Sequence, residues 1–184
     1  MPKKSAGVLM YRNTADSTEV FLVHPGGPFW AKKDDGAWSI PKGEFAENED
    51  PMEVAKREFQ EETSFAVEGH FETLEPARQP SGKIVYAWSV EGDIDASAIH
   101  SNNFSIEWPA GSGRVQEFPE VDRAGWFDLS MARTKLLKGQ VPLLEQLQQS
   151  LTRKGLLRSL GEKPSGRKAK AASTPEQTDL FDKT

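Results

Sequence analysis

Three glutamates on one predicted helix, Glu58, Glu61 and Glu62, are the side chains of this sequence best suited to chemistry. At about 100° per residue, they fall within a single arc of about 100° on the helix surface. Like charges four residues apart destabilise a helix by roughly 0.2–0.5 kcal/mol, so the cluster favours a bound cation. Oxygen ligands suit Mg²⁺ or Mn²⁺, and protein-bound Mg²⁺ commonly contacts phosphate as well. The cluster therefore indicates metal-assisted phosphate chemistry, and the alternative is an ordinary solvated acidic face.

The residues around these glutamates follow a regular spacing. In order, the segment reads Gly43, five residues, Glu49, seven residues, Arg57-Glu58-Phe59, one residue, Glu61-Glu62, one residue and Ser64-Phe65. The pattern resembles the Nudix box, Gly-x5-Glu-x7-Arg-Glu-U-x-Glu-Glu-x-Gly-U with U a bulky apolar residue, and agrees at eight of its nine specified positions. The exception is Ser64, which stands where the family has glycine. A left-handed residue just beyond a helix costs a non-glycine side chain about 1 kcal/mol, so Ser64 weakens a turn and removes no ligand.

The resemblance implies both a fold and an activity. Nudix hydrolases cleave a nucleoside diphosphate linked to another group, with a divalent metal and water, and their α/β fold is an α/β/α sandwich with a mixed β-sheet. Carried onto this chain, Glu58, Glu61 and Glu62 would hold Mg²⁺, with Mn²⁺ as a substitute, and the Gly43 carbonyl would assist. The metal would neutralise diphosphate oxygens and lower the pKa of a bound water.

Further roles follow from the same resemblance. Arg57 would orient a catalytic carboxylate, and Glu49 would support it by pairing with Arg57. A carboxylate outside the box often serves the family as base or ligand, and the candidates here are Glu117 and Glu120. The sequence does not choose between these two, and both are equally compatible with surface loop acids.

Substrate contacts are predicted upstream of the helix. The segment 38–43 is similar to the approach to the box in the diadenosine tetraphosphate hydrolase branch, so Lys42 is expected to face phosphate. In the preceding loop, Phe29 or Trp30 is a candidate for stacking a base, with Lys32 or Lys33 on phosphate. The alternatives are a Trp30 that caps the core edge and lysines that are merely solvated. The histidines lie far apart without ligand spacing and are assigned no function: His24, His70 and His100.

The elements that must position these residues alternate between strands and helices. Asp50 is a good N-cap and Pro51 suits the first turn, which predicts a helix over 51–63. Short apolar runs predict strands, and helical spacing recurs near the end. The expected strands cover 7–11, 20–24, 38–41, 71–77, 83–91, 104–108 and 125–127, with a turn at Gly43 and helices over 131–137 and 141–157. Strands and helices in this order indicate a mixed α/β sheet.

Composition narrows the class of protein. The 184 residues include no cysteine, which excludes a disulfide framework, thiolate zinc and a cysteine nucleophile. No apolar run approaches the roughly 20 residues of a membrane span, and the N-terminus lacks a signal-peptide core. We therefore expect a cytoplasmic protein with no membrane partner.

The C-terminal segment differs from the rest of the chain. Residues 152–172 carry seven basic residues and one acidic residue, and from residue 161 the sequence loses its aromatics and periodicity. We expect a catalytic domain over 1–160 and a disordered tail over 161–184. The tail ends with Gln177, Leu180 and Phe181 in a pattern that resembles the peptide by which bacterial proteins bind the sliding clamp. Direct nucleic-acid binding by the basic stretch is not expected, because such runs are more often solubilising linkers.

The expected activity is Mg²⁺-dependent hydrolysis of a phosphoanhydride, with a dinucleoside polyphosphate as the first substrate. The alternative is removal of noncanonical or oxidised nucleoside triphosphates, which a clamp-binding tail would favour. Two readings of another class are a noncatalytic nucleotide-binding Nudix module and a clamp-associated adaptor.

Overall fold

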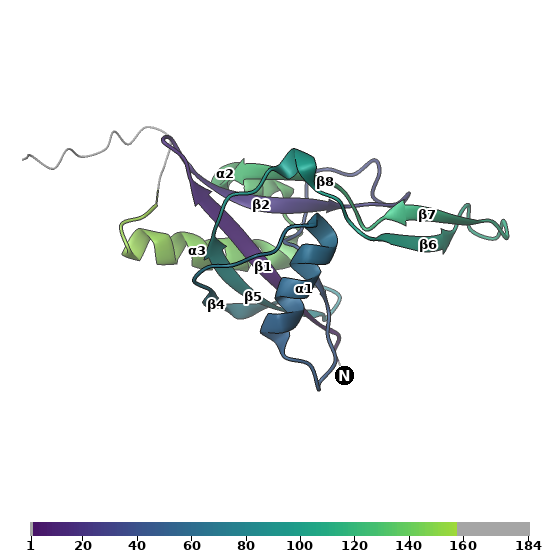
Figure 1. Ribbon diagram of the computed structural model, residues 1–184, viewed down its shortest axis with the longest axis horizontal. Helices are drawn as coiled ribbons and strands as arrows, with labels where there is room; N and C mark the ends of the chain where they lie inside the picture. The colour runs from purple at the N-terminus through teal and green to yellow at the C-terminus, as the bar shows by residue number, and fades with distance from the viewer. Residues whose placement is uncertain (1, 158–184) are drawn as a thin grey trace, which may run out of the picture.

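The computed structural model describes residues 2–157 (Figure 1). The predicted boundary near residue 160 and the predicted clamp peptide with Gln177, Leu180 and Phe181 lie outside the described residues. Within residues 2–157, no helix is long and apolar enough to cross a membrane.

A mixed β-sheet forms the centre of the fold. Its strands are β1 (Lys4–Asn13), β2 (Thr18–Pro25), β3 (Lys42–Glu44), β4 (Glu72–Arg78), β5 (Ile84–Glu91) and β8 (Val121–Asp128). They are ordered β4-β5-β1-β2-β8, and β3 also pairs with β1. β1 and β5 are parallel, while the other neighbours are antiparallel. The predicted α/β class with a mixed sheet is confirmed.

Helices cover both faces of this sheet (Figure 1). They are α1 (Pro51–Thr63), α2 (Leu129–Lys135) and α3 (Val141–Arg153), with short 3-10 turns η1 (Ala96–Ala98) and η2 (Lys138–Gln140). Because side chains alternate along a strand, Val8 of β1 belongs to the core that includes Phe59 of α1, while Leu9 belongs to the opposite core, which includes Leu144 of α3. The two cores on opposite faces explain why most of β1 is buried.

The start of α1 is determined by local chemistry. The Asp50 carboxylate accepts hydrogen bonds from the backbone N–H groups of Met52 at 2.8 Å and Glu53 at 3.1 Å. Pro51 occupies the first turn, where a missing N–H costs nothing. The helix predicted over 51–63 is confirmed, and it presents the three box glutamates from one rigid element.

The short strand before α1 begins later than predicted. Of the predicted strand over 38–41, only Trp38 and Ser39 form isolated bridges. The regular strand is β3, so Gly43 lies in a strand and not in a turn. The reason is that Pro41 has no N–H to give to a ladder, although its carbonyl accepts from Val8 N–H at 3.1 Å. Beyond Pro41 the chain pairs with β1, and Gly43 lies opposite Ala6.

A separate two-stranded hairpin projects from the body of the molecule (Figure 1). It consists of β6 (Asn103–Glu107) and β7 (Val115–Pro119), which are antiparallel. The sequence predicted the first strand and missed the second, whose residues are mostly exposed and carry little apolar periodicity. Helix α3 is also shorter than predicted, since it ends at Arg153.

Candidate active site

The carboxylate face of α1 lies directly against β3. The Glu62 carboxylate accepts a hydrogen bond from the Lys42 backbone N–H at 3.2 Å. At Gly43, a Cβ atom would lie 1.9 Å from the carboxyl carbon of Glu58, far inside van der Waals contact. Glycine at this position therefore leaves the space that the Glu58 side chain occupies.

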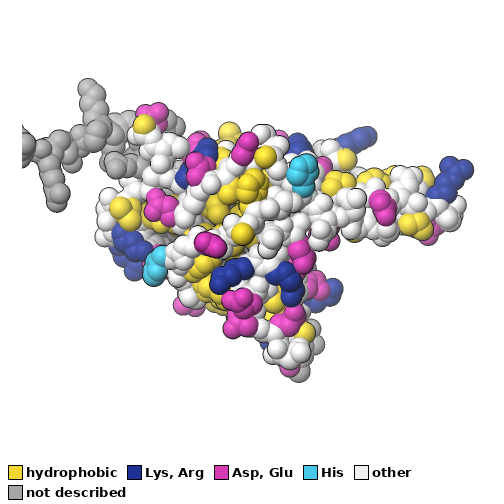
Figure 2. Space-filling model, in the orientation of Figure 1, with side chains coloured by type: hydrophobic (Ala, Val, Ile, Leu, Met, Phe, Trp, Pro, Cys, Tyr) yellow, Lys and Arg dark blue, Asp and Glu magenta, His cyan; other side chains and the backbone are white. Residues whose placement is uncertain are grey.

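Arg57 connects the carboxylates on the exposed side of α1. Its guanidinium donates to Glu49 at 3.1 Å and to Glu58 at 3.3 Å, and it lies 3.8 Å from Glu61. Glu49 also accepts the Ala46 backbone N–H at 2.8 Å, which holds it beside Arg57. The structure thus brings together the arginine and the supporting glutamate of the predicted box. In Figure 2, acidic and basic side chains lie next to one another over this helix.

Backbone hydrogen bonds attach three distant segments to the end of α1. The Asn102 N–H donates to the Glu61 carbonyl at 3.1 Å, and the Glu120 N–H donates to the Asn102 carbonyl at 2.8 Å. The Gly26 N–H in turn donates to the Glu120 carbonyl at 2.9 Å. This series places Glu120, at the base of the projecting hairpin, beside the helix carboxylates.

The electrostatics of the cluster show a surplus of negative charge. Burial raises the pKa of Glu62 to about 8, and the charges of Glu58 and Glu120 act in the same direction, whereas Lys42 opposes them. Burial also raises the pKa of Glu58 and of Glu120, and the charge of Glu61 adds to both effects. Carboxylates held this way are stabilised in their charged form by a nearby cation.

Lys42 is the cation that the chain itself places against this cluster. Burial lowers the pKa of its ammonium group, and the neighbouring charges of Glu62 and Glu58 act to raise it. Within residues 2–157, the ammonium group makes no hydrogen bond or ion pair. Lys42 is thus a partly buried donor available to an anionic ligand at the mouth of the site.

The remaining predicted site residues are placed differently from one another. Glu117 is exposed on β7 opposite Ser105, and it does not contribute to the pKa shifts of the cluster as Glu120 does. Trp30 packs against the core, with the Lys33 ammonium 4.6 Å from its ring centre. Lys32 is exposed.

His24, to which the sequence assigned no function, is fully buried in β2. Its Nδ1 lies 2.7 Å from a carboxylate oxygen of Asp122, and its Nε2 donates to the Lys33 carbonyl at 2.8 Å. The ring therefore ties the loop after β2 to the start of β8. No sequence pattern around this histidine, which lies in an apolar strand, predicts its contacts with distant segments.

Ser64 adopts the left-handed conformation expected for the family glycine, with φ 66° and ψ 7°. Its backbone N–H donates to the Gln60 carbonyl at 2.7 Å. Its hydroxyl donates to the His100 carbonyl at 2.7 Å, which offsets part of the conformational cost. The substitution therefore preserves the turn and leaves every box carboxylate in place.

The donor set of the cluster fits a divalent metal by its chemistry. It consists of carboxylate oxygens, and the surplus of buried negative charge at Glu62 is the feature a cation would stabilise. In this arrangement, no three acidic or histidine side chains of residues 2–157 converge closely enough to hold an ion. Glu58 is turned onto Gly43 and Arg57, and Glu62 onto the Lys42 N–H, so binding requires side-chain rotation on an otherwise fixed helix.

Comparison with known proteins identifies the family. A family model described as the NUDIX domain matches residues 1–147. The chain belongs to the Nudix family. No curated protein matches it.

Solved structures share this Nudix fold at low sequence identity. An Ap4A hydrolase binary complex from C. elegans is 23% identical, with a TM-score of 0.55, covering 82% of this chain and 98% of that one. The NUDIX domain of Shewanella oneidensis NrtR, complexed with ADP ribose, is 16% identical, with a TM-score of 0.57 and coverage of 82% and 89%. A mutT/nudix family protein from Listeria innocua is 18% identical, with a TM-score of 0.56 and coverage of 85% and 98%.

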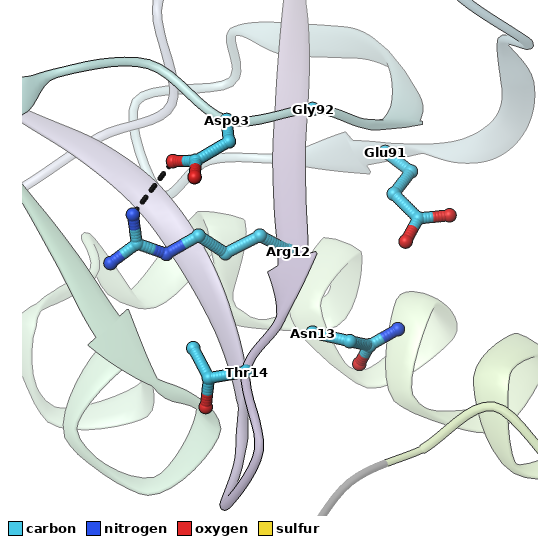
Figure 3. Close-up of a pocket in the computed structure, with 6 residues that line it drawn as sticks. All are labelled: Arg12, Asn13, Thr14, Glu91, Gly92 and Asp93. Atoms are coloured by element: carbon cyan, nitrogen blue, oxygen red, sulfur yellow. Dashed lines mark hydrogen bonds and ion pairs between the residues drawn. The ribbon is translucent and has the colours of Figure 1, made fainter.

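A second hollow in this Nudix domain lies at the opposite end of β1 (Figure 3). There the Arg12 guanidinium pairs with Asp93 at 2.7 Å and Glu19 at 2.8 Å, and stacks 4.2 Å from the ring centre of Trp126. These contacts satisfy the arginine within the fold, so its guanidinium is not free to pair with an anionic ligand. The Nudix box therefore remains the candidate active site.

Proposed function

We propose that this Nudix protein is a Mg²⁺-dependent hydrolase of a phosphoanhydride bond in a nucleotide, and that a dinucleoside polyphosphate is its substrate. The observation that carries the proposal is the excess of partly buried carboxylate on one face of α1, with the pKa of Glu62 raised to about 8. An acidic cluster of this kind is costly for folding alone, and such costs concentrate at functional sites.

Each residue of the cluster has a distinct part in this proposal. Glu58, Glu61 and Glu62 would hold the metal, which when bound neutralises phosphate oxygens and lowers the pKa of water. Arg57 keeps Glu58 oriented through the contact at 3.3 Å. Glu120 accepts a proton from the attacking water, for which its raised pKa is suitable.

Lys42 binds the phosphate chain in this proposal. Its ammonium group is partly buried, adjoins Glu62 and Glu58, and is unpaired within residues 2–157. Phosphate oxygens would supply the partner that it lacks, and ionic pairing would offset its desolvation. A polyphosphate has more anionic oxygens than Lys42 alone can pair, and the exposed Lys32 and Lys33 are the further cations that we propose for it, which favours a polyphosphate substrate.

The experiment is a substrate panel assayed with Mg²⁺ and then with Mn²⁺. The panel contains dinucleoside polyphosphates, canonical and oxidised nucleoside triphosphates, ADP-ribose and inositol pyrophosphates, and it follows phosphate, pyrophosphate and nucleotide release. We expect turnover of dinucleoside polyphosphates, lost in Glu61→Gln and Glu62→Gln. Glu53→Gln is the matched control, because Glu53 lies on the same helix and pairs with Lys56 at 3.2 Å.

The other outcomes of this panel separate the competing functions. Preferential hydrolysis of oxidised nucleoside triphosphates would contradict the dinucleoside polyphosphate proposal and favour removal of oxidised nucleotides as the function. Silence of the folded protein with both metals would contradict hydrolysis and favour the nucleotide-binding module.

We also propose that residues 161–184 form a tether that carries a sliding-clamp peptide. The support is the sequence pattern of Gln177, Leu180 and Phe181, in which an amide faces a pocket rim and two apolar side chains fill the pocket. A peptide of residues 173–184 should bind purified bacterial clamp, and Leu180→Ala with Phe181→Ala should abolish binding. Absence of binding by the unmutated peptide would refute this proposal and leave the hydrolase proposal intact.

A further inference from the structure

One face of the projecting hairpin is aromatic. Phe104 of β6 lies opposite Phe118 of β7, with ring centres 6.1 Å apart. Because side chains alternate along a strand, Ile106 and Trp108 follow Phe104 on the same face. Figure 2 shows hydrophobic side chains along this hairpin. An isolated two-stranded sheet is marginal in water, so its apolar face requires something to pack against.

The loop after β2 covers only part of that face. A Cβ atom at Gly27 would lie 2.8 Å from the tip of the Phe104 ring, so the loop backbone is in close contact there. Farther out, Phe29 meets Trp108 edge to face, with ring centres 5.3 Å apart and planes at 78°. Phe29 is 57% exposed, whereas Trp30 beside it packs on the core. Phe29 and Trp108 therefore form an aromatic corner with ring surface open to solvent.

This aromatic corner is rigidly connected to the carboxylate cluster. The Gly26 N–H donates to the Glu120 carbonyl, and Phe29 follows three residues later, at most about 10 Å along the chain. On the other side, Trp108 N–H donates to the Arg114 carbonyl, and Arg114 is about 20 Å along the strand direction from Glu120 at about 3.3 Å per residue. The corner is thus linked to the segment that carries Glu120 on both sides, through Gly26 and through the hairpin.

The geometry points to Phe29 and Trp108 as a stacking site for the second nucleobase of a dinucleoside polyphosphate. This inference rests on the proposed function, since the first phosphates would lie against Lys42. A nucleobase has the flat π-face that an open aromatic corner accepts, and the phosphate chain between the two ends would pass the basic loop. The base supplies the packing that the hairpin lacks, while the negative chain matches Lys32 and Lys33.

The expected effect is a change in affinity for dinucleotides alone. Base stacking on an aromatic side chain is worth about 1–3 kcal/mol, which corresponds to roughly 5- to 150-fold in binding. Phe29→Ala and Trp108→Ala should each raise KM for diadenosine tetraphosphate by a factor in this range. KM for adenosine 5′-tetraphosphate, which has no second base, should change less than about twofold. Phe29→Tyr and Trp108→Phe should restore the dinucleotide KM, because they keep a ring.

Val115→Ala provides the control variant. Val115 is on the same hairpin and is 70% exposed, but it pairs with Glu107 on the opposite face. Its KM for both substrates should equal that of the wild type. Fluorescence quenching by diadenosine tetraphosphate in Ca²⁺ buffer, compared between the wild type and Trp108→Phe, gives a second reading of binding without turnover.

The outcomes of these experiments distinguish the stacking site from the proposed hydrolase function on which it rests. Wild-type turnover of the dinucleotide with unchanged KM in both alanine variants would overturn the stacking site and leave the hydrolase. Failure of the wild type to bind or cleave either nucleotide would overturn both. In sedimentation, the wild type could be a dimer that Phe29→Ala converts to a monomer without a change in KM. This outcome would show that the aromatic corner contacts a second copy of the chain, and it would also overturn the stacking site.

Discussion

Replacing Glu62 by glutamine is expected to stabilise the metal-free protein at neutral and alkaline pH. Glu62 lies partly buried against β3 with the negative charges of Glu58 and Glu120 nearby, and its pKa is raised from 4.5 to about 8. Glutamine has nearly the same shape and keeps an oxygen that accepts the Lys42 N–H, but it carries no charge. The substitution therefore removes a cost that the wild-type chain bears for its site.

The sign and size of this effect follow from proton linkage. A raised pKa means that folding favours the protonated form, so the contribution is fully present below about 4.5 and is lost as the pH rises to about 8. Each pKa unit corresponds to about 1.4 kcal/mol, so the upper limit of the stability change at pH 7 is about 3 kcal/mol. The wild type should lose stability across this window more steeply than Glu62→Gln. At pH 4 the two proteins should be similar.

The assay is urea unfolding at pH 4, 6 and 8 in EDTA, repeated at pH 8 with Mg²⁺. Without metal, Glu62→Gln should unfold at higher urea than the wild type at pH 8. With Mg²⁺, the difference in urea midpoint between the two proteins should shrink or change sign. Metal binding to the native state stabilises the wild type more, because the wild type retains the Glu62 ligand. Glu53→Gln should follow the wild type throughout. Equal unfolding curves for the wild type and Glu62→Gln at pH 8 in EDTA would refute the electrostatic reasoning.

Substitutions at three further positions test the geometry around this site. Gly43→Ala should displace the Glu58 carboxylate by more than 1 Å, given a Cβ position 1.9 Å from its carboxyl carbon, and lower kcat/KM about 100-fold with little change in urea midpoint. Unchanged Mn²⁺ affinity and unchanged turnover would contradict this. Ser64→Ala should lower the free energy of unfolding by about 1 kcal/mol, since it keeps the positive φ and loses the hydrogen bond to His100. Ser64→Gly should lower the free energy of unfolding by less, because glycine adopts a positive φ without strain. Parallel urea titrations of the two variants would measure this difference. His24→Leu removes, from a fully buried position, the donor to the Lys33 carbonyl and the contact with Asp122, and should cost roughly 1–3 kcal/mol; a wild-type urea midpoint would exclude a structural role for the ring.

The parts of the structure that the sequence predicted are those determined by short-range chemistry. Helix α1 begins and ends where predicted, because Asp50 and Pro51 define its start and Thr63 precedes the left-handed Ser64. The contacts of Arg57 with its carboxylate neighbours follow from helix geometry and the nearby turn. The continuous apolar run at the start of the chain likewise marked β1, most of which is buried.

The parts that the sequence missed depend on pairing between distant segments. Gly43 was predicted in a turn because glycine and proline commonly mark turns, yet it pairs with Ala6 of β1. Its lack of a side chain serves the close approach of Glu58, which cannot be seen before the helix is packed on the strand. Strand β7 was missed because its exposed residues are ordered mainly by β6 and not by a core.

The choice between Glu117 and Glu120 illustrates the same limit at the level of chemistry. Both are glutamates, and they lie only three positions apart in the chain, so the surrounding sequence does not distinguish them. Strand β7 ends at Pro119, so Glu117 stays in the hairpin ladder, while the backbone of Glu120 bonds to Asn102 and Gly26 and carries its side chain to the cluster. A strand that ended elsewhere would change this placement, since neighbouring side chains point to opposite faces. The residue proposed to take the proton is thus selected by a long-range backbone network that single-sequence patterns do not encode.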